Sequence, residues 1–131
     1  MFYYPPFLYG GIIMAKELKT NAMRFLDKSG INYEIQVYQC DEFIDGITVA
    51  EKLGQPADET FKTLIAQGKT GSYYCFLLPV ALELDLKKAA KSVGEKSVEL
   101  LHVKDITKVT GYVRGGCTPI GMKKQFMTVV H

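Results

Sequence analysis

Apolar residues recur along this chain with two different spacings, and these spacings predict where its strands and helices lie. Strict alternation between apolar and polar residues, as in Tyr33-Glu-Ile-Gln-Val-Tyr38, is typical of a half-buried strand. Apolar segments on either side of the turn at residues 68–71 predict a β-hairpin. Five segments are predicted as strands: residues 33–38, 61–66, 72–79, 98–102 and 126–130.

Apolar residues at helical spacing lie between these strands. The first helix begins at Thr20 or Asn21, whose side chains can cap its first turn, and Gly30 ends it. Further helices are predicted at Thr48–Gly54, Leu84–Val93 and Asp105–Thr110. The helix at 84–93 is expected to carry lysines outward and to pack these residues inward: Leu84, Leu86, Ala89, Ala90 and Val93. Helices that alternate irregularly with hairpins predict an α+β fold with a mixed sheet.

Length and composition are those of an ordinary globular domain. With 131 residues, 47% of them apolar and 23% charged, the chain can bury the core of one domain. Cys40, Cys75 and Cys117 are odd in number and far apart, and only His102 and His131 could join them. This spacing is not that of a zinc site, so we expect no metal and no other cofactor. Reduced thiols in a cytoplasmic protein are the simplest interpretation.

Charge is distributed unevenly along the chain. Residues 1–61 hold five Lys/Arg and nine Asp/Glu, a net −4, whereas residues 62–131 hold eleven and five, a net +6. The asymmetry predicts a basic face formed by the second half, which suits a nucleic-acid ligand. Lysine-rich helices give the same asymmetry in proteins that bind no nucleic acid, so charge alone does not identify the ligand.

The first fourteen residues are uncharged and largely apolar. They lack the basic residues of a signal peptide, Pro5 and Pro6 break any apolar helix, and the stretch is too short to span a bilayer. We therefore expect no membrane association, an atypical apolar extension at residues 1–13, and one domain at residues 14–131. An added strand or a self-association surface that supports a homodimer is the alternative interpretation of the extension.

The segment Gly111-Tyr-Val-Arg-Gly-Gly-Cys-Thr-Pro-Ile-Gly-Met-Lys-Lys124 carries most of the candidate chemistry. Three of its glycines lie within seven residues, where they permit left-handed backbone and a close approach of a ligand to main-chain N–H groups. Arg114 and two lysines flank these glycines and favour an anion such as phosphate. A tight turn between two strands is the simpler interpretation of a Gly-Gly pair taken alone.

Three segments of the chain, in this order, resemble the YbaK family of free-standing aminoacyl-tRNA deacylases. They are Phe61-Lys-Thr-Leu-Ile65, Leu84-Asp-Leu-Lys-Lys-Ala-Ala-Lys-Ser-Val-Gly94 and the glycine-rich segment. The same superfamily supplies the editing domain inserted in many bacterial prolyl-tRNA synthetases. The resemblance implies an α+β fold with a mixed, partly barrel-like sheet and flanking helices. It also implies trans-editing hydrolysis of mischarged aminoacyl-tRNA, above all Cys-tRNA(Pro).

The resemblance implies two catalytic groups. Lys62 matches the lysine most closely tied to activity in the family, and it would act as a cation placed against the terminal adenosine or the scissile ester. Gly115 and Gly116 would supply backbone N–H donors to the substrate, with Gly115 in the catalytic role and Gly116 in binding. Taken without the family, Lys62 reads as a solvated strand lysine.

Four further positions are implied to shape the substrate pocket. Pro119 and Gly121 would fix the shape of the glycine-rich segment. Tyr38 matches an aromatic position that borders the pocket, although an amphipathic core tyrosine explains it nearly as well. Thr63 would contribute a hydroxyl group. The implied partners are the aminoacylated 3′ end of tRNA and prolyl-tRNA synthetase.

Two features of the sequence leave alternatives open. Cys117 lies on a glycine loop, but thiolate catalysis needs a base and no suitable histidine is evident, so we do not expect a cysteine hydrolase. Family members usually continue beyond His131 through a strand and a loop that border the pocket. We therefore expect an open sheet edge near residues 126–130 and impaired activity. The alternatives are a tRNA-end or synthetase-binding module without turnover and a degenerate oligomeric homologue.

Overall fold

The computed structural model describes residues 19–39 and 42–131, so the apolar extension at residues 1–13 lies outside the described part. The described ranges contain four helices: α1 (Asn21–Lys28), α2 (Gly46–Leu53), α3 (Leu86–Ser92) and α4 (Val103–Thr110). They also contain four strands: β1 (Phe61–Gly68), β2 (Tyr73–Pro79), β3 (Val98–Leu100) and β4 (Met127–Val130). None of these helices is long and apolar enough to cross a membrane.

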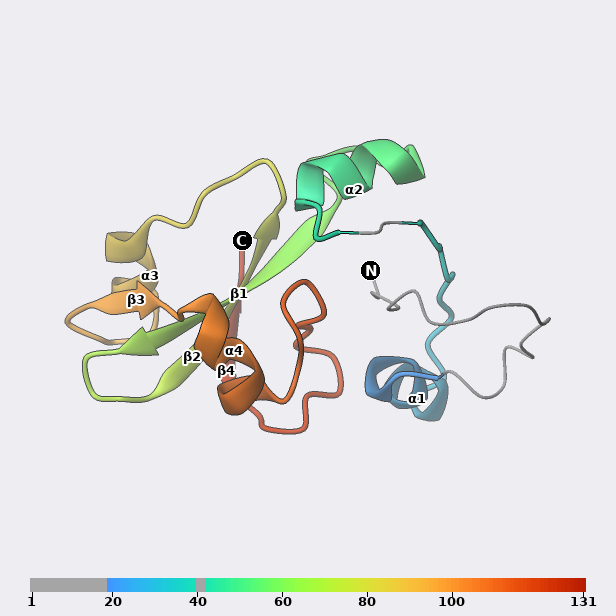
Figure 1. Cartoon of the computed structure of the whole chain (residues 1–131). Coiled ribbons are helices and arrows are strands. Elements are labelled where there is room, and N and C mark those ends of the chain that lie inside the picture. The colour runs from blue at the N-terminus through green and yellow to red at the C-terminus, as the bar shows by residue number, and fades with distance from the viewer. Residues whose placement is uncertain (1–18, 40–41) are drawn as a thin grey trace.

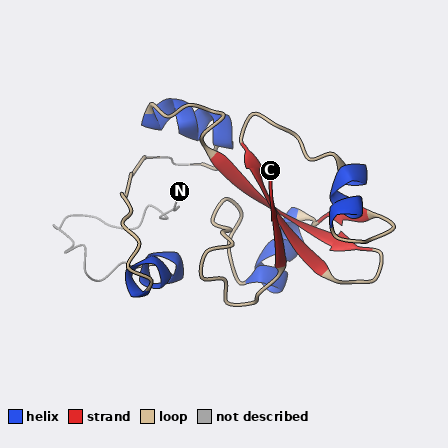
Figure 2. Cartoon of the chain, turned by 180° about the vertical axis from the view of Figure 1, so that it is seen from behind, coloured by secondary structure: helices blue, strands red, loops and turns tan. Residues whose placement is uncertain are grey.

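A twisted sheet forms the centre of the molecule, with helices and long loops on both sides (Figures 1 and 2). Its strand order is β3-β1-β2-β4. β1 pairs antiparallel with β2 and with β3, whereas β4 runs parallel to β2. The predicted α+β fold with a mixed sheet is therefore confirmed.

The sheet is open, so the expectation of a partly barrel-like sheet is wrong for the described residues. Closing a sheet requires its first and last strands to pair with each other. Here the two edges are β3, with three residues, and β4, with four, and neither pairs with the other. The predicted edge near residues 126–130 is present in the described part of the chain, where β4 pairs with β2 alone.

Side-chain caps determine where three of the helices begin. Thr20, Asp45 and Asp85 each accept a hydrogen bond from a backbone N–H in the first turn that follows, over 2.7–3.2 Å. Such a cap satisfies donors that the helix itself leaves unpaired, and it contributes about 1 kcal/mol. The predicted cap at Thr20 is confirmed, and the chain turns out of α1 through Gly30 at φ 68°.

The first face of the sheet is covered by α3 (Figure 1). Its core consists of small and aromatic residues that are at most 5% exposed: Ala66, Phe76, Ala89, Ala90 and Val98. Leu84 and Val93 pack against this core as predicted, but Leu86 is 41% exposed, and its predicted burial is wrong. Leu86 is the first residue of α3, so it lies at the end of the helix rather than over the sheet.

The second face of the sheet is covered by α4 and by the loop that connects it to β4. Ile65, Cys75 and Met122 form the buried centre of this face. Tyr112, Cys117 and Phe126 are among the partly buried residues that pack against it. A long irregular segment is thus held on a rigid sheet, an arrangement in which loops commonly carry function.

Residues 33–38 are not a strand, contrary to the prediction. The segment contains no helix or strand, and Ile35 and Val37 are 50% and 72% exposed. Alternation of apolar and polar residues leads to a strand only where a neighbouring strand pairs with the segment, and residues 33–38 take part in none of the strand pairs of the described sheet. The predicted strand at residues 98–102 is shorter than expected, because β3 ends at Leu100 and His102 is the residue that precedes α4.

Candidate active site

The glycine-rich segment, residues 111–124, forms the loop between α4 and β4, and we call it the glycine loop. It leaves α4 at Gly111 and crosses the second face of the sheet (Figure 1). Gly115 and Gly121 have φ values of 81° and 63°, in the left-handed region. Other L-residues adopt this conformation at a cost of roughly 1–2 kcal/mol, so glycine is needed at both positions.

Gly115 lies against the loop that leads into α2. A Cβ atom at Gly115 would lie 3.3 Å from Cε2 of Phe43, closer than most real Cβ contacts. The guanidinium group of the neighbouring Arg114 lies over the same ring, 3.8 Å from its centroid. Two segments that are far apart in the sequence therefore meet at Gly115.

The amide groups of the two adjacent glycines differ in their availability. The N–H of Gly116 donates to the carbonyl oxygen of Val113 over 3.0 Å, which closes a turn within the glycine loop. The N–H of Gly115 donates to no group in the described part of the chain. Of the Gly-Gly pair, Gly115 is thus the residue whose amide can meet a ligand.

Gly121 holds the other end of the glycine loop against α1. A Cβ atom there would lie 2.9 Å from the carbonyl oxygen of Asn21 and 3.0 Å from Cβ of Phe25. Together with the positive φ, this contact excludes any side chain at Gly121 without movement of α1. Gly121 therefore fixes where α1 sits relative to the loop, and Pro119 lies half-buried between the two ends of the loop.

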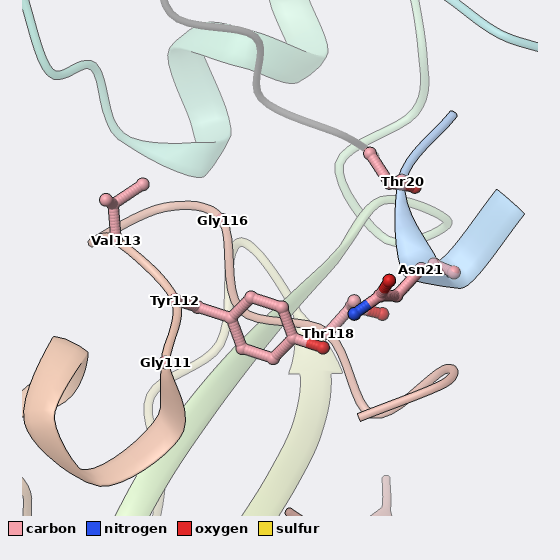
Figure 3. Close-up of a pocket in the computed structure, with 8 residues that line it drawn as sticks. Thr20, Asn21, Gly111, Tyr112, Val113, Gly116 and Thr118 are labelled. Atoms are coloured by element: carbon pink, nitrogen blue, oxygen red, sulfur yellow. The ribbon is translucent and has the colours of Figure 1, made fainter. Parts of the chain in front are cut away.

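A cavity of about 190 Å³ lies between the start of α1 and the glycine loop (Figure 3). Thr20 and Asn21 line it from α1, and Tyr112, Gly116 and Thr118 line it from the loop. The lining combines hydroxyls, an amide and backbone with the apolar side chains of Ala22 and Val113, and it contains no charged side chain. The cavity therefore suits a small, neutral, hydrogen-bonding group.

The hydroxyl of Tyr112 is the one buried side-chain polar atom in the described residues that has no hydrogen-bond partner. In Figure 3 it points from the ring toward the side of the cavity formed by Asn21 and Thr118. Burial raises the pKa of Tyr112, and the backbone of Lys123 opposes this rise. A buried hydroxyl left unpaired costs about 1–3 kcal/mol, so a ligand that hydrogen-bonds to it in the cavity would recover part of this cost.

Lys62 lies at the second position of β1, half-buried, opposite Leu78 of β2. Side chains alternate along a strand, so Lys62 shares the face of Ala66, while Thr63 shares the face of Ile65 below the glycine loop. Neither Lys62 nor Leu78 belongs to the core under α3. The Nζ atom of Lys62 donates to the carbonyl oxygen of Val80 over 3.1 Å, at the end of the sheet.

The loop that enters α2 connects Lys62 to the glycine loop. Hydrogen bonds from Thr48 lower the pKa of Asp45, and the ammonium group of Lys62 adds to this effect from nearby. Two residues before Asp45, Phe43 contacts Gly115. The structure thus joins Lys62 to Gly115 through one short loop, although Lys62 does not line the cavity.

The remaining predicted residues differ in burial and in whether they line the cavity. Thr63 is half-buried in β1, on the face that carries the glycine loop. Tyr38 is half-buried at the end of the extended segment, not on a strand, and it does not line the cavity. Gly116 does line the cavity, whereas Gly115 faces Phe43.

Cys117 is not placed to act as a nucleophile. Its Sγ atom lies 4.0 Å from the hydroxyl of Thr110 and 4.0 Å from the carbonyl oxygen of Val113, and neither group is a base. Burial raises the pKa of the Cys117 thiol, and burial raises that of Cys75 to about 11. Both thiols therefore stay protonated at neutral pH and behave as core residues.

Two residues of the site were missed by sequence reasoning. Phe43 lies outside all predicted helices and strands, and nothing in the local pattern indicates that it lies against Gly115. Tyr112 belongs to the glycine-rich segment, whose glycines and charges were considered but not its aromatic residue. An aromatic side chain beside several glycines was the available signal. Both residues become visible only when segments distant in sequence are brought together.

Comparison with known proteins gives the site its context. The family model of the aminoacyl-tRNA editing domain matches residues 46–130, a range that includes Lys62 and the glycine loop. A protein of Enterococcus faecalis named as Cys-tRNA(Pro)/Cys-tRNA(Cys) deacylase EbsC is 46% identical over 111 residues. That alignment covers 84% of this chain and 68% of the relative.

Solved structures agree on the fold. The chain resembles a crystal structure of a hypothetical protein with a TM-score of 0.75 at 22% identity, over 85% of this chain and 73% of that one. It resembles a trans-editing enzyme for prolyl tRNA synthetase with a TM-score of 0.69 at 24% identity, over 87% and 73%. At this identity the likeness establishes the architecture, while the family match and the close relative establish kinship. Lys62 and the glycine loop thus both lie within the matched domain, and the chain belongs to the aminoacyl-tRNA editing domain family.

Proposed function

We propose that this protein removes the amino acid from mischarged tRNA in trans, and that Cys-tRNA(Pro) is its substrate. The observation that carries this proposal is the 46% identity to a protein named as a Cys-tRNA(Pro)/Cys-tRNA(Cys) deacylase. The editing-domain match over residues 46–130 supports the reaction class. The geometry of the glycine loop supports a mechanism based on positioning.

The reaction needs little acid–base chemistry. An aminoacyl ester on the 3′ end of tRNA is already activated, so the enzyme must polarise its carbonyl and hold the RNA and the nucleophile at attack distance. Near the glycine loop the described residues offer backbone donors and hydroxyls, and the two thiols there are protonated. Such a site suits hydrolysis by substrate positioning.

Gly115 is proposed to donate its N–H to the ester carbonyl oxygen. A donor aimed at the developing oxyanion contributes roughly 10²–10³ in rate. The left-handed backbone at Gly115 and the absence of a described partner for its amide support this role. Gly116 instead stabilises the turn and presents its backbone to the cavity.

Lys62 is proposed to place a positive charge against the terminal nucleotide at the end of the sheet. Within residues 19–39 and 42–131 its ammonium group makes one hydrogen bond, to Val80, and it has three donors, so two of them are available to the RNA. The hydrogen bond to the carbonyl oxygen of Val80 holds the ammonium group at this end of the sheet. We assign Lys62 to binding and charge stabilisation, not to nucleophilic attack.

The nucleophile is proposed to come from the substrate or from water. For a cysteinyl ester, the thiol sulfur attacks the carbonyl carbon, the bond to the 3′ oxygen breaks, and that oxygen takes the thiol proton. The products are a cyclic thioester and uncharged tRNA, and no protein nucleophile is needed. For other amino acids water attacks at the same carbon, which yields the free amino acid.

Partners follow from the same proposal. The aminoacylated 3′ end of tRNA is the substrate, and prolyl-tRNA synthetase is the enzyme whose errors would supply it. A second copy of the chain is the further partner proposed, because Met127 and Val130 of the edge strand β4 are 57% and 61% exposed. Light scattering of the purified protein measures this directly, and a monomer at all concentrations would contradict the dimer.

The function is tested by incubating the protein with tRNA(Pro) charged with cysteine, alanine or proline. We expect loss of the cysteinyl ester to exceed the spontaneous rate and the rate for prolyl ester. Ester loss at the spontaneous rate for all three would contradict the proposal. Tight binding of the charged tRNA without ester loss would instead identify a binding module.

A further inference from the structure

The contact between Arg114 and Phe43 is the feature of this surface that the positioning mechanism does not use. The guanidinium group lies 3.8 Å from the centroid of the ring, in a cation–π arrangement. Arg114 is exposed, and Phe43 is 52% exposed. A large aromatic ring that remains half in water beside a candidate active site calls for an explanation.

The stack lies beside the proposed reacting centre. Arg114 immediately precedes Gly115, and the ring of Phe43 contacts the position that a Gly115 side chain would occupy. In a charged tRNA the ester is attached to the ribose of the terminal nucleotide, so the base of that nucleotide lies within a few bonds of the ester. A ligand whose ester lies at Gly115 therefore carries its base close to the stack.

The chemistry of the pair fits an unpaired nucleobase. Single-stranded RNA ends are recognised by stacking on aromatic rings and on arginine guanidinium planes. A guanidinium plane that lies against an aromatic ring on one side presents its other side to a ligand. Lys123 and Lys124, both exposed on the same loop, supply charge for the adjoining phosphates.

We infer that the Arg114–Phe43 stack is the platform on which the unpaired base at the 3′ end of the RNA stacks. This inference rests on the proposed function for its choice of RNA. Arg114 provides the flat surface and a charge, Phe43 holds the guanidinium plane in place, and Gly115 sets the distance from the base to the ester.

The experiment uses an uncharged RNA hairpin that ends in unpaired CCA, with 2-aminopurine in place of the terminal adenine. Stacking quenches 2-aminopurine fluorescence, so the readout needs neither an amino acid nor turnover. Arg114→Lys keeps the charge and removes the plane. Phe43→Leu keeps an apolar contact with Gly115 and removes the ring. Lys124→Ala is the matched control, because it removes a charge from the same loop and no plane.

We expect the wild-type protein to quench the probe. Arg114→Lys and Phe43→Leu should lose the quenching and weaken binding roughly 5- to 100-fold, the range that stacking of one base provides. Lys124→Ala should keep the quenching, bind more weakly and depend less steeply on salt. Circular dichroism of each variant checks that it is folded.

Two results would overturn the platform. In the first, Arg114→Lys quenches and binds like the wild-type protein, which would leave the contact as a clip that only holds the glycine loop. In the second, the wild-type protein deacylates charged tRNA without quenching the probe. A protein that quenches the probe but hydrolyses no ester would keep the platform and contradict the proposed function, so the two failures are distinguishable.

Discussion

The two faces of the sheet are built in different ways. The face under α3 is closed by a short helix with a side-chain cap, and its core residues Ala66, Phe76 and Val98 are at most 5% exposed. The face under the glycine loop is closed by irregular backbone with three left-handed glycines near a cavity. It also retains the unpaired hydroxyl of Tyr112.

Apart from Lys62, which lies at the end of β1 on the face of Ala66, this difference separates the residues that hold the fold from those that serve the ligand. A face optimised only for stability would not keep an unpaired hydroxyl, and it would avoid long irregular connections. The β1–β2 hairpin contributes side chains to both faces. The core on the α3 side therefore stabilises the same two strands against which the glycine loop packs. The following substitutions test this division of labour.

The largest effect on stability is expected from Phe76→Ala on the α3 face. Phe76 is 3% exposed, and removal of a buried phenylalanine costs about 3–5 kcal/mol. Urea unfolding measures the loss, and single-turnover deacylation measures the rate per folded molecule. A large drop in that rate, with stability unchanged, would break the comparison between the two faces.

Gly115→Ala is expected to do the reverse and to reduce the deacylation rate more than the stability. The positive φ and the 3.3 Å approach to Phe43 force the loop to move, so the amide leaves its position and deacylation falls roughly 10²–10³-fold. Gly116→Ala is the matched control, because φ at Gly116 is ordinary and its Cβ would lie 3.4 Å from Val113. Equal losses in the two variants would remove the special role of Gly115.

Tyr112→Phe is expected to raise the free energy of unfolding by about 1 kcal/mol, because it removes a buried hydroxyl that has no partner in the described residues. Ligand binding should weaken in the same variant, because the hydroxyl that would hydrogen-bond to a ligand in the cavity is removed. Thermal unfolding with and without uncharged tRNA measures both quantities. A destabilised Tyr112→Phe protein would show that the hydroxyl already has a structural partner.

Cys117→Ala is expected to have the smallest effect on catalysis. The thiol has no base beside it and burial raises its pKa, so deacylation should stay within about tenfold of the wild-type rate. A loss beyond about a hundredfold, the scale of general-base catalysis, would restore the thiol mechanism.

The sequence predicted the features that depend on local chemistry. The cap at Thr20, the turn at Gly30 and the β1–β2 hairpin were found where the residue types placed them. The predicted strand at residues 33–38 was wrong because alternation describes the residues of a segment and not its neighbours. The predicted burial of Leu86 was wrong because helical spacing does not show where a helix begins.

The candidate site was predictable in part for the same reason. Residue types and the resemblance indicated Lys62 and the glycines, since their motifs are contiguous. The contact of Phe43 with Gly115 and the approach of α1 to Gly121 depend on the packing of distant segments. The difference between the amides of Gly115 and Gly116 was also beyond the sequence, because the turn hydrogen bond of Gly116 depends on backbone geometry.

The most direct test of the account compares Lys62→Ala with Lys69→Ala in single-turnover deacylation of Cys-tRNA(Pro). Lys69 is an exposed cation in the β1–β2 turn, so its loss removes the same charge away from the site. We predict that Lys62→Ala loses deacylation while its circular dichroism spectrum is unchanged, and that Lys69→Ala keeps the wild-type rate. A folded Lys62→Ala protein that deacylates as fast as Lys69→Ala would contradict the proposed site.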